Sequence, residues 1–510
     1  MATKIETSIF NKKIKIPSSS PDILLISAPI TVTELPFMAG AALKAIANKA
    51  GYSCSTFDLN RMTLKWIQAQ ESEKKSANLS NFFFDWGSGT IDNCREEINY
   101  WTAECVSLIQ QYNPKILGIS VFTDCSRMAT KLIAEQVKKQ CPNIKILIGG
   151  TGIAKGQRYG VSDSISFAEK LRRDGIIDDY IQGDAEYSFY EFLKNNLDFP
   201  GINVSDWQRL DNASLTTIPY PDYSDYDWNL YSIRAIGITG SRGCVRKCTF
   251  CDSIVHHKKY TWRSGEDIFE EMIEQKLKHN ISYFQFSDSL LNGNMKEFRK
   301  LIELLANYNN QCQNPGDKLQ YDCYFIFRPK AHFNEGLWKL VAESGCKFLF
   351  VGVETFSERV RAHMGKGYNN DDLEFSVEMA AKYKVPVLLM TFVGYPTETE
   401  EDFEENIKWL TAHQHYRHNF LMFVSPSMVL LPDTWLDQNK DILNIKILDP
   451  QNRESWVSTE NGSTLEIRNQ RRERLIQHIK DLNWPQYDLY SPHALLEHIL
   501  ISPEPILFTA

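Results

Sequence analysis

Long apolar runs are missing from this sequence. Its most apolar stretches, such as residues 385–394, have roughly half the length that a membrane-spanning helix needs. The N-terminal residues include several lysines but no apolar core with a small-residue cleavage site, so we expect no secretory signal. These features predict a cytoplasmic protein without a membrane partner.

The sequence also has no excess of basic over acidic residues and no cysteine pattern typical of disulfide-bonded domains. Its N-terminal half contains no histidine. The 510 residues carry a formal net charge of −8, which argues against a general nucleic-acid-binding surface. Eleven cysteines form no small-domain disulfide framework and would stay reduced in a cytosol. All eleven histidines lie at position 256 or later, so the first half of the chain offers no imidazole to a metal.

Strand-like and helix-like stretches alternate between residues 21 and 199, after an N-terminal extension at 1–20. Continuous apolar runs separated by amphipathic stretches are typical of a parallel sheet covered on both faces. Five such units, with an insertion of low regularity after the second strand, predict a flavodoxin-like, doubly wound α/β domain that binds ligands at its strands' carboxyl ends. The expected strands lie at 22–30, 53–60, 116–123, 144–150 and 178–183, and the expected helices at 37–50, 97–111, 126–140 and 187–195.

A second alternation occupies residues 234–430, after a linker at 200–233. The linker is acidic and rich in tyrosine, and we expect its aromatic side chains to pack between domains. Six further units fall short of the eight of a complete barrel, so they predict a partial (β/α)6 TIM-like barrel. Residues 431–510 form a C-terminal, substrate-side segment, whose basic helix at 468–482 either faces solvent or contacts an anionic substrate. The expected barrel strands lie at 235–241, 282–288, 321–328, 347–354, 386–394 and 419–426.

Three cysteines follow the first barrel strand in the segment SRGCVRKCTFC. Cys244, Cys248 and Cys251 have the spacing C-x3-C-x2-C and lie where barrel-type folds place their chemistry. Thiolates are standard ligands of iron–sulfur clusters, and three of them on a 4Fe–4S cluster leave one iron open to a substrate or cofactor. Structural zinc is the alternative, with His256 or His257 as the fourth ligand.

This cysteine pattern, with Phe250 before its last member, resembles the signature of the radical S-adenosylmethionine (SAM) superfamily. The resemblance implies a 4Fe–4S cluster on the three cysteines, SAM at the open iron, and Phe250 beside the SAM. In that family, an electron from the cluster cleaves a C–S bond of SAM and releases a 5′-deoxyadenosyl radical. The protein positions and shields the radical, while the cofactor supplies the chemistry.

Polar residues at later strand ends resemble that family's contacts to SAM. Ser287 and Asp288 end the second barrel strand, in place of the commoner glycine-glycine-glutamate. Arg328 ends the third strand and Glu354 the fourth, and both resemble contacts to the ribose and the methionine carboxylate. Alternatively, Glu354 only pairs with a neighbouring arginine. Two further segments are similar to stretches that follow the fourth and fifth strands in many members, residues 363–367 and 393–403.

A flavodoxin-like domain ahead of such a barrel is similar to the cobalamin-binding subclass. Its strand ends resemble those that surround the corrin, because a broad, flat ligand needs close backbone approach. Alternatively, the glycines serve only tight strand-to-helix turns. The DxHxxG pattern of the cobalamin mutases is absent, so bound cobalt would lack a lower histidine from this domain. The expected cobalamin contacts are Ser120, Val121, Phe122, Thr123, Gly149, Gly150, Thr151, Gly152, Gly183 and Glu186.

These features predict a cobalamin-dependent radical methylase that acts on an unactivated carbon of a small molecule or peptide. A radical cyclase or rearrangement enzyme with the same cofactors is the second hypothesis. A non-catalytic cobalamin or redox sensor is the third, and the domain could also be a relic that has lost its corrin. The intact cysteine triad and the polar strand ends disfavour a sensor, which needs no SAM pocket. An enzyme of this kind would depend on an external electron donor of the flavodoxin or ferredoxin type.

Replacement of Cys244, Cys248 and Cys251 by alanine should abolish cluster binding. We expect the anaerobically reconstituted wild-type protein to hold about four iron atoms per chain and the triple variant to hold none, because the thiolates are the cluster's only protein ligands. Iron and sulfide content, together with the visible absorbance, measure this. A triple variant that retains a full four-iron cluster would contradict the assignment.

Overall fold

The structure is a computed structural model in which the described residues form two compact units, one up to Tyr231 and one from Ile233. Most of the expected N-terminal extension, residues 200–211 of the expected linker and residues 488–510 of the C-terminal segment lie outside the described residues. Within the described ranges, no helix combines the length and apolar character that a membrane crossing requires. The structure describes residues 19–29, 35–70, 72–84, 91–154, 165–195, 212–231, 233–257, 259–450 and 452–487.

The first unit is built on a five-stranded parallel sheet with the order β2-β1-β3-β4-β5. The chain changes its direction of travel across the sheet between β1 and β3, as in flavodoxin-like doubly wound folds. The expected fold class of this part is therefore confirmed. Its strands are β1 (Ile23–Ser27), β2 (Cys54–Phe57), β3 (Ile116–Ser120), β4 (Lys145–Gly149) and β5 (Asp179–Ile181).

Helices cover both faces of this sheet, which explains why its strands are continuously apolar. Ile23 and Leu25 pack on the side of α1 and α7, whereas Leu24 and Ile26 pack on the opposite side. The helices of the first face are α1 (Met38–Lys49) and α7 (Ala185–Lys194). Those of the second are α2 (Leu59–Gln68), α3 (Glu73–Phe84), α4 (Arg95–Tyr112), α5 (Ser126–Gln140) and α6 (Phe167–Arg173).

Helices α2 and α3 occupy the place where the sequence predicted an insertion of low regularity. Asp58 begins α2 by accepting a hydrogen bond from the backbone N–H of Arg61 at 3.0 Å, as helix caps do. In α3, Leu79 is buried, and Phe83 packs 4.7 Å from the ring of Trp101. The expectation was wrong because the apolar residues of α3 gather at its end, without the even spacing of an amphipathic helix.

The described part of the expected linker, residues 212–231, packs against the first unit. The Tyr226 hydroxyl donates to the backbone oxygen of Phe37 at 2.7 Å. The Tyr231 hydroxyl donates to Asp58 Oδ2, also at 2.7 Å. Each buried hydroxyl thus has a partner within this unit, as buried tyrosines require.

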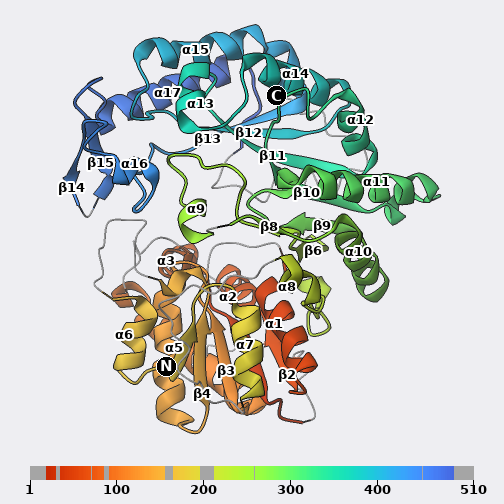
Figure 1. The fold of residues 1–510 in the computed structure, drawn as a ribbon. Helices are drawn as coiled ribbons and strands as arrows, with labels where there is room; N and C mark the ends of the chain where they lie inside the picture. The colour runs from red at the N-terminus through yellow and green to blue at the C-terminus, as the bar shows by residue number, and fades with distance from the viewer. Residues whose placement is uncertain are drawn as a thin grey trace. The chain divides into compact units, whose positions relative to one another are not determined.

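The second unit is built on a six-stranded parallel sheet with the order β13-β12-β11-β10-β9-β6. Each strand lies beside its predecessor in the barrel, so the predicted partial (β/α)6 arrangement is confirmed. Five long helices gather along one side of this sheet (Figure 1): α10 (Gly265–His279), α11 (Met295–Gln311), α12 (Glu335–Glu343), α14 (Asn370–Lys382) and α15 (Glu400–Ala412). The strands are β6 (Ala235–Ile238), β9 (Tyr283–Phe286), β10 (Gln320–Phe325), β11 (Cys346–Glu354), β12 (Val387–Thr391) and β13 (Phe420–Val424).

Shorter elements and a C-terminal hairpin with one helix complete the described fold. They are α8 (Asn212–Thr217), β7 (Ser241–Arg242), α9 (Ser253–His256), β8 (Thr261–Trp262), α13 (Glu358–Met364), α16 (Trp435–Gln438), β14 (Ile445–Asp449), β15 (Asn452–Ser458) and α17 (Leu465–Asp481). The strands β7 and β8 pair with each other, as do β14 and β15, both antiparallel.

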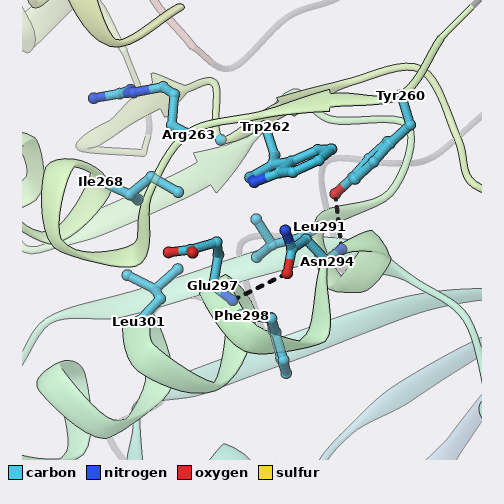
Figure 2. A pocket seen from close by; sticks show the side chains of 10 residues that line it. Tyr260, Trp262, Arg263, Ile268, Leu291, Asn294, Glu297, Phe298 and Leu301 are labelled. Atoms are coloured by element: carbon cyan, nitrogen blue, oxygen red, sulfur yellow. Dashed lines mark hydrogen bonds between the residues drawn. The ribbon is translucent and has the colours of Figure 1, made fainter. Parts of the chain in front are cut away.

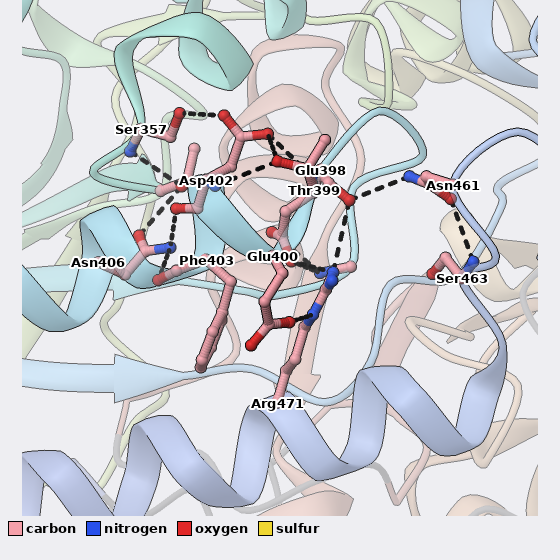
Figure 3. A network of polar contacts seen from close by, with 12 residues as sticks. Ser357, Glu398, Thr399, Glu400, Asp402, Phe403, Asn406, Asn461, Ser463 and Arg471 are labelled. Carbon is pink, nitrogen blue, oxygen red and sulfur yellow. Dashed lines mark hydrogen bonds and ion pairs between the residues drawn. The ribbon is translucent and has the colours of Figure 1, made fainter.

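The basic helix α17 packs into the second unit through its arginines. Arg468 is fully buried; its guanidinium lies 3.8 Å from the centre of the Trp456 ring and donates to the backbone oxygen of the same residue at 3.0 Å. Arg471 donates to the buried carboxylate of Glu398 at 3.0 Å (Figure 3). Both arginines therefore hold the fold together, and neither the solvent-facing nor the substrate-facing role predicted for this helix applies to them.

The variant Arg471→Met should destabilise the second unit more at pH 8 than at pH 6. Burial raises the pKa of Glu398 to about 7, although Arg471 and the Gly394 amide counteract the effect. Without the guanidinium, ionisation of this carboxyl leaves a buried, unpaired charge, which costs roughly 3–5 kcal/mol. Because the folded state raises the pKa of Glu398, the contribution of this carboxyl to the free energy of unfolding is complete below its unfolded pKa. That contribution is lost as the pH rises through the folded pKa.

Calorimetry of wild type and variant at both pH values measures this difference as the change in Tm. The double variant with Glu398→Gln removes the titrating group, so its loss of Tm should be the same at pH 6 and pH 8. Equal losses at the two pH values in the single variant would count against the assignment.

Candidate functional site

The three predicted cysteines lie on one loop that begins directly after β7. Cys248 is buried, whereas Cys244 and Cys251 are half-buried. The backbone N–H of Arg246 donates to Cys244 Sγ, and that of Ser253 donates to Cys251 Sγ, each at 3.4 Å. Hydrogen bonds of this kind to sulfur help to set the properties of iron–sulfur clusters.

The surroundings of these thiols favour their neutral form as long as no metal replaces the proton. Burial raises the pKa of Cys251 to about 12, and it raises the pKa of Cys248 above its usual range. Cys244 raises the pKa of both thiols further, and Cys248 adds to the effect on Cys251. Binding of iron would displace the protons, since metals bind thiolates. The donor set fits a 4Fe–4S cluster in number, type and hydrogen bonding.

No group of three or more His, Cys, Asp or Glu side chains in the described part of the chain is arranged to hold a single metal ion. Ligands of a cluster bind different irons and need not converge on one point. His256, one of the two histidines considered for zinc, lies with its Nε2 3.7 Å from Asp252 Oδ2.

The segment that follows β11 braces the cysteine loop. The N–H of Thr249 donates to the backbone oxygen of Met364 at 3.1 Å. The Thr249 hydroxyl also lies 2.7 Å from the hydroxyl of Tyr395, which in turn lies 2.7 Å from Nδ1 of His363. Both segments that resemble family stretches, residues 363–367 and 393–403, thus contact the loop that carries the cysteines.

Phe250 lies between a ring and a cation. Its ring packs edge-on against Phe392 at 5.2 Å, and the ammonium of Lys366 lies 5.6 Å from the ring centre. This arrangement suits a cation–π contact and fixes the ring beside Cys251.

Glu354, at the end of β11, forms a partly buried ion pair with Lys366. Lys366 Nζ donates to Glu354 Oε1 at 2.6 Å and to the backbone oxygen of Gly352 at 2.8 Å. Burial opposes the charge of Lys366, yet Glu354 and Cys248 raise its pKa above the usual value. Glu354 itself has a φ of 69°, a left-handed backbone conformation that is strained for residues other than glycine. Such strained residues are concentrated at functional sites. The predicted pairing partner was an arginine; the structure shows a lysine.

The two residues that end the expected second barrel strand lie in different surroundings. Asp288 is buried and accepts hydrogen bonds from the Gly240 N–H at 2.8 Å and the Ser241 hydroxyl at 2.9 Å. Burial raises the pKa of Asp288 to about 6, despite those two donors. Ser287 is exposed, and its hydroxyl lies 3.0 Å from that of Thr239. Asp288 therefore positions the start of the cysteine loop, while Ser287 presents its hydroxyl at the strand end.

Arg328 follows β10, and its guanidinium is half-buried. Nη2 donates to the backbone oxygens of Asn292 and Gly293 at 2.6 and 2.8 Å, while Nε has no hydrogen-bond partner among the described residues. Burial lowers the pKa of Arg328, and the positive charge of Arg246 on the cysteine loop lowers it further. Two cations thus interact here, and no carboxylate in the described ranges forms an ion pair with either. An anionic ligand would relieve this repulsion.

A small pocket lies behind Gly240, between β8, α10 and α11 (Figure 2). The rings of Tyr260 and Trp262 stack at 5.7 Å along its wall. The Tyr260 hydroxyl accepts from the Asn294 N–H at 3.3 Å. These contacts support the start of the cysteine loop from the helix side. The residues that line the pocket are Gly240, Tyr260, Trp262, Arg263, Ile268, Leu291, Asn294, Glu297, Phe298 and Leu301.

In the first unit, the loops after β3 and β4 lock together through their backbones. The Val121 N–H donates to the Gly149 oxygen at 2.7 Å, and the Gly152 N–H donates to the Val121 oxygen at 2.9 Å. A Cβ atom on Gly150, whose φ is 108°, would lie 2.5 Å from the Val121 oxygen. On Gly152 it would lie 2.5 Å from the Thr123 oxygen. These two glycines are needed for contact between the loops themselves.

The other residues predicted to contact cobalamin line the same edge of the sheet. Phe122 is 56% exposed, and the Thr151 hydroxyl donates to the backbone oxygen of Phe122 at 2.5 Å. Tyr187, in the first turn of α7, is 54% exposed and escaped the sequence analysis, although it directly follows the predicted contact Glu186. The edge therefore presents two exposed aromatic rings. Ser120, Gly149 and Gly183 are half-buried at or just after the ends of β3, β4 and β5, and Glu186 is half-buried in the first turn of α7.

Comparison with known proteins places these observations in context. Residues 238–410 match a family model described as Radical SAM superfamily. The chain is 23% identical over 339 residues to an uncharacterized methyltransferase, PH0819, of Pyrococcus horikoshii, covering 62% of this chain and 68% of that one. It is 25% identical over 244 residues to bacteriochlorophyllide d C-12(1)-methyltransferase of Chlorobaculum tepidum, covering 46% and 50%. The match to anaerobic magnesium-protoporphyrin IX monomethyl ester cyclase of Synechocystis sp. is 20% over 316 residues, covering 59% and 58%. The chain thus spans between 50% and 68% of the length of these relatives.

Solved structures share the fold over most of the chain. The structure of TsrM, a radical S-adenosylmethionine methyltransferase from Kitasatospora setae with cobalamin and a 4Fe–4S cluster bound, superposes with a TM-score of 0.63 at 14% identity. This superposition covers 94% of this chain and 96% of TsrM. OxsB, a cobalamin-dependent S-adenosylmethionine radical enzyme, gives 0.53 at 14% identity, covering 91% and 61%. At these identities the likeness concerns the fold.

Glu354→Ala should weaken SAM binding about tenfold or more, the effect of losing a hydrogen bond to a charged group. Lys366→Met should act in the same direction because it releases the carboxylate from its fixed position. Iron content should stay unchanged in Glu354→Ala, since Glu354 is not a cluster ligand. Calorimetric titration of SAM into anaerobic, reconstituted protein measures the affinity.

Glu343→Ala is the matched control, because Glu343 is an exposed carboxylate at the end of α12 with only a 3.7 Å ion pair to Lys339. Its SAM affinity should equal that of wild type. Folded Glu354→Ala protein with unaltered SAM binding would remove Glu354 from the site.

Proposed function

Because residues 238–410 belong to the radical SAM superfamily, we propose that this radical SAM enzyme is a cobalamin-dependent methyltransferase acting on an unactivated carbon. The observation that carries the proposal is the fold that 94% of the chain shares with TsrM, whose structure holds both cobalamin and a 4Fe–4S cluster. The methyltransferases among the sequence relatives support the same reaction type.

In this proposal Cys244, Cys248 and Cys251 hold the cluster, which leaves one iron open to SAM. When bound, the cluster supplies the electron that cleaves SAM. The hydrogen bonds to the loop, from Asp288 on one side and from Tyr395 on the other, fix the positions of the three sulfurs. Fixed ligands matter because a small displacement at a reacting centre costs much of its rate.

Charged residues at the strand ends orient SAM. The guanidinium of Arg328 offers its Nε, and the adjacent positive charge of Arg246 strengthens the attraction for a carboxylate. Glu354 is held by Lys366 and can accept hydrogen bonds from a hydroxyl or an ammonium group. Ser287 adds an exposed hydroxyl at the neighbouring strand.

The exposed rings of Phe122 and Tyr187 form the apolar part of a corrin site in this proposal. Exposed aromatic groups at the carboxyl edge of a doubly wound sheet suit a broad, flat ligand. When bound, cobalamin supplies the methyl group. No histidine occurs before position 256, so this unit would offer no imidazole to bound cobalamin.

Ring formation is the second candidate function, and the resemblance to the magnesium-protoporphyrin cyclase favours it. A cyclase would use the same cysteine loop and SAM contacts. It would differ from a methyltransferase in leaving the methyl group of SAM in place.

Analysis of SAM products distinguishes these functions without knowledge of the substrate. The anaerobic protein, loaded with cluster and cobalamin and given a reductant, should form both 5′-deoxyadenosine and S-adenosylhomocysteine from SAM. Only methyl transfer gives the second product. With SAM deuterated in its methyl group, mass spectrometry of a cell extract should reveal a product that carries the intact trideuteromethyl group. Formation of 5′-deoxyadenosine alone would support the cyclase, and formation of neither would overturn both.

The variant Phe122→Glu provides an internal control for the corrin. It should lower bound cobalamin and S-adenosylhomocysteine while leaving the iron content unchanged, because a carboxylate replaces an exposed ring. Leu277→Glu, which replaces a 79% exposed residue on α10, should change neither.

A further inference from the structure

The loop that carries the three cysteines is basic, although the chain as a whole is acidic. Residues 242–259 contain five lysines or arginines and one aspartate, in a sequence whose formal net charge is −8. The single aspartate, Asp252, lies 3.7 Å from Nε2 of His256. Positive charge is therefore concentrated where the cluster would bind, and a local charge of this kind attracts acidic partners and steers their approach.

Two of these lysines are exposed and unpaired. Lys247 lies between the first two cysteines, and Lys259 follows α9. The backbone of Lys259 borders the start of the loop, because a Cβ atom on Gly243 would lie 2.9 Å from its oxygen. Neither lysine side chain forms an ion pair or a hydrogen bond with another described residue. Lys366, by contrast, is buried and paired with Glu354. The charges of Lys247 and Lys259 are thus available to a partner.

Apolar side chains lie beside the exposed lysines. Val245, which directly follows the first cysteine, is 39% exposed, and Trp435 of α16 is 41% exposed. A backbone contact places α16 at the loop, since the N–H of Leu436 donates to the Thr249 oxygen at 3.0 Å. Protein interfaces typically combine an apolar or aromatic centre of this type with a polar rim.

The end of α13 joins these residues into one surface. A Cβ atom on Gly365 would lie 3.4 Å from the backbone oxygen of Lys247. Two residues earlier, the exposed ring of His363 meets the ring of Trp435 edge-on at 6.1 Å. The backbone of Lys247 and the ring of Trp435 therefore both contact residues 363–365. We name this surface the loop face and define it by Val245, Lys247, Lys259, His363 and Trp435.

A cluster on the three cysteines would lie close to the loop face. Cys244 and Cys251 are only half-buried, and Val245 and Lys247 are the direct neighbours of Cys244 and Cys248 in the sequence. Electron transfer between two proteins requires that their redox centres approach each other closely. Encounters of this kind are typically weak and bury little surface, so a face of a few residues suffices.

We propose that the loop face is the docking site of the external electron donor, a small acidic protein that carries a flavin or an iron–sulfur cluster. The inference rests on the proposed function and deepens it, since it names the partner that supplies the electron for SAM cleavage. The donor loses one electron and the oxidised cluster gains it, so no bond, proton or leaving group takes part in this step. Lys247 and Lys259 attract the acidic donor, and Val245 and Trp435 provide the apolar contact.

Rates of cluster reduction by two different reductants test this assignment. Reduced flavodoxin is an acidic protein, whereas photoreduced 5-deazariboflavin is a small, uncharged molecule that needs no docking face. In stopped-flow measurements at low salt, Lys247→Glu should slow reduction by flavodoxin roughly tenfold, and Lys259→Glu should act in the same direction, because reversed rim charges lower the association rate. The difference should shrink as salt is added, since ions screen exposed charges. Reduction by deazariboflavin should proceed at the wild-type rate.

Two further variants separate charge, apolar contact and general effects. Trp435→Ala should slow reduction by flavodoxin at least threefold at every salt concentration, because an apolar contact is not screened. Lys339→Glu is the matched control, since Lys339 is exposed on α12 with only a 3.7 Å ion pair to Glu343. It should leave both rates unchanged. Iron content is measured first, and if Lys247→Glu fails to load a cluster, Lys259→Glu and Trp435→Ala decide.

Two outcomes would overturn the proposal. If the charge reversals at the loop slow flavodoxin no more than Lys339→Glu does, the loop face is not the docking site. If they slow both reductants equally, the lysines act on the cluster itself and not on a partner. Cluster reduction is measured without SAM or substrate, so absent methyl transfer would count against the proposed function without altering this result.

Discussion

The buried ammonium of Lys366 joins the parts of the second unit on which its chemistry depends. It pairs with Glu354 at 2.6 Å, donates to the backbone oxygen of Gly352 near the end of β11 and lies over the ring of Phe250. One cation therefore fixes the end of a strand and the cysteine loop relative to each other. A negatively charged cluster at this loop would find a counter-charge already in place, held by a carboxylate that cannot move without breaking the ion pair.

Three buried carboxyl groups of the second unit accept hydrogen bonds that connect its loops and strands. Asp288 holds the start of the cysteine loop, Glu398 accepts from the N–H of Gly394, and Asp322 joins β10 to β9 through Gln285. Burial raises the pKa of each of these carboxyls to between about 6 and 7. Such groups are structural while their donors remain and become costly once a donor is lost. The rigidity of the site thus depends on hydrogen bonds to carboxyls that lie between strands and loops.

Sequence patterns predicted the sheets well because buried parallel strands are apolar throughout, and α5 has the predicted bounds, Ser126–Gln140. The cysteine loop was predictable because its ligands are close in sequence. Contacts between separate elements were not predictable. Lys366, for example, pairs with Glu354, which lies twelve residues away on another element. The role of Arg468 was hidden because a run of charges normally marks a solvent-facing helix, whereas here Trp456 and backbone oxygens satisfy a buried guanidinium. For Gly150, the sequence predicted a close approach to the backbone. It could not show that the neighbouring loop, through the Val121 oxygen, makes this approach in place of a ligand.

In the two loops after β3 and β4, the atoms that hold the loops together are largely different from the side chains that face outward. Their contact runs mainly through backbone atoms and two glycines, so an outward-facing side chain such as that of Phe122 takes little part in holding the edge together. Mutation can therefore change those side chains freely while the framework beneath them stays the same. Successive single substitutions of these side chains can therefore change which ligand the edge prefers, while every variant along the way stays folded.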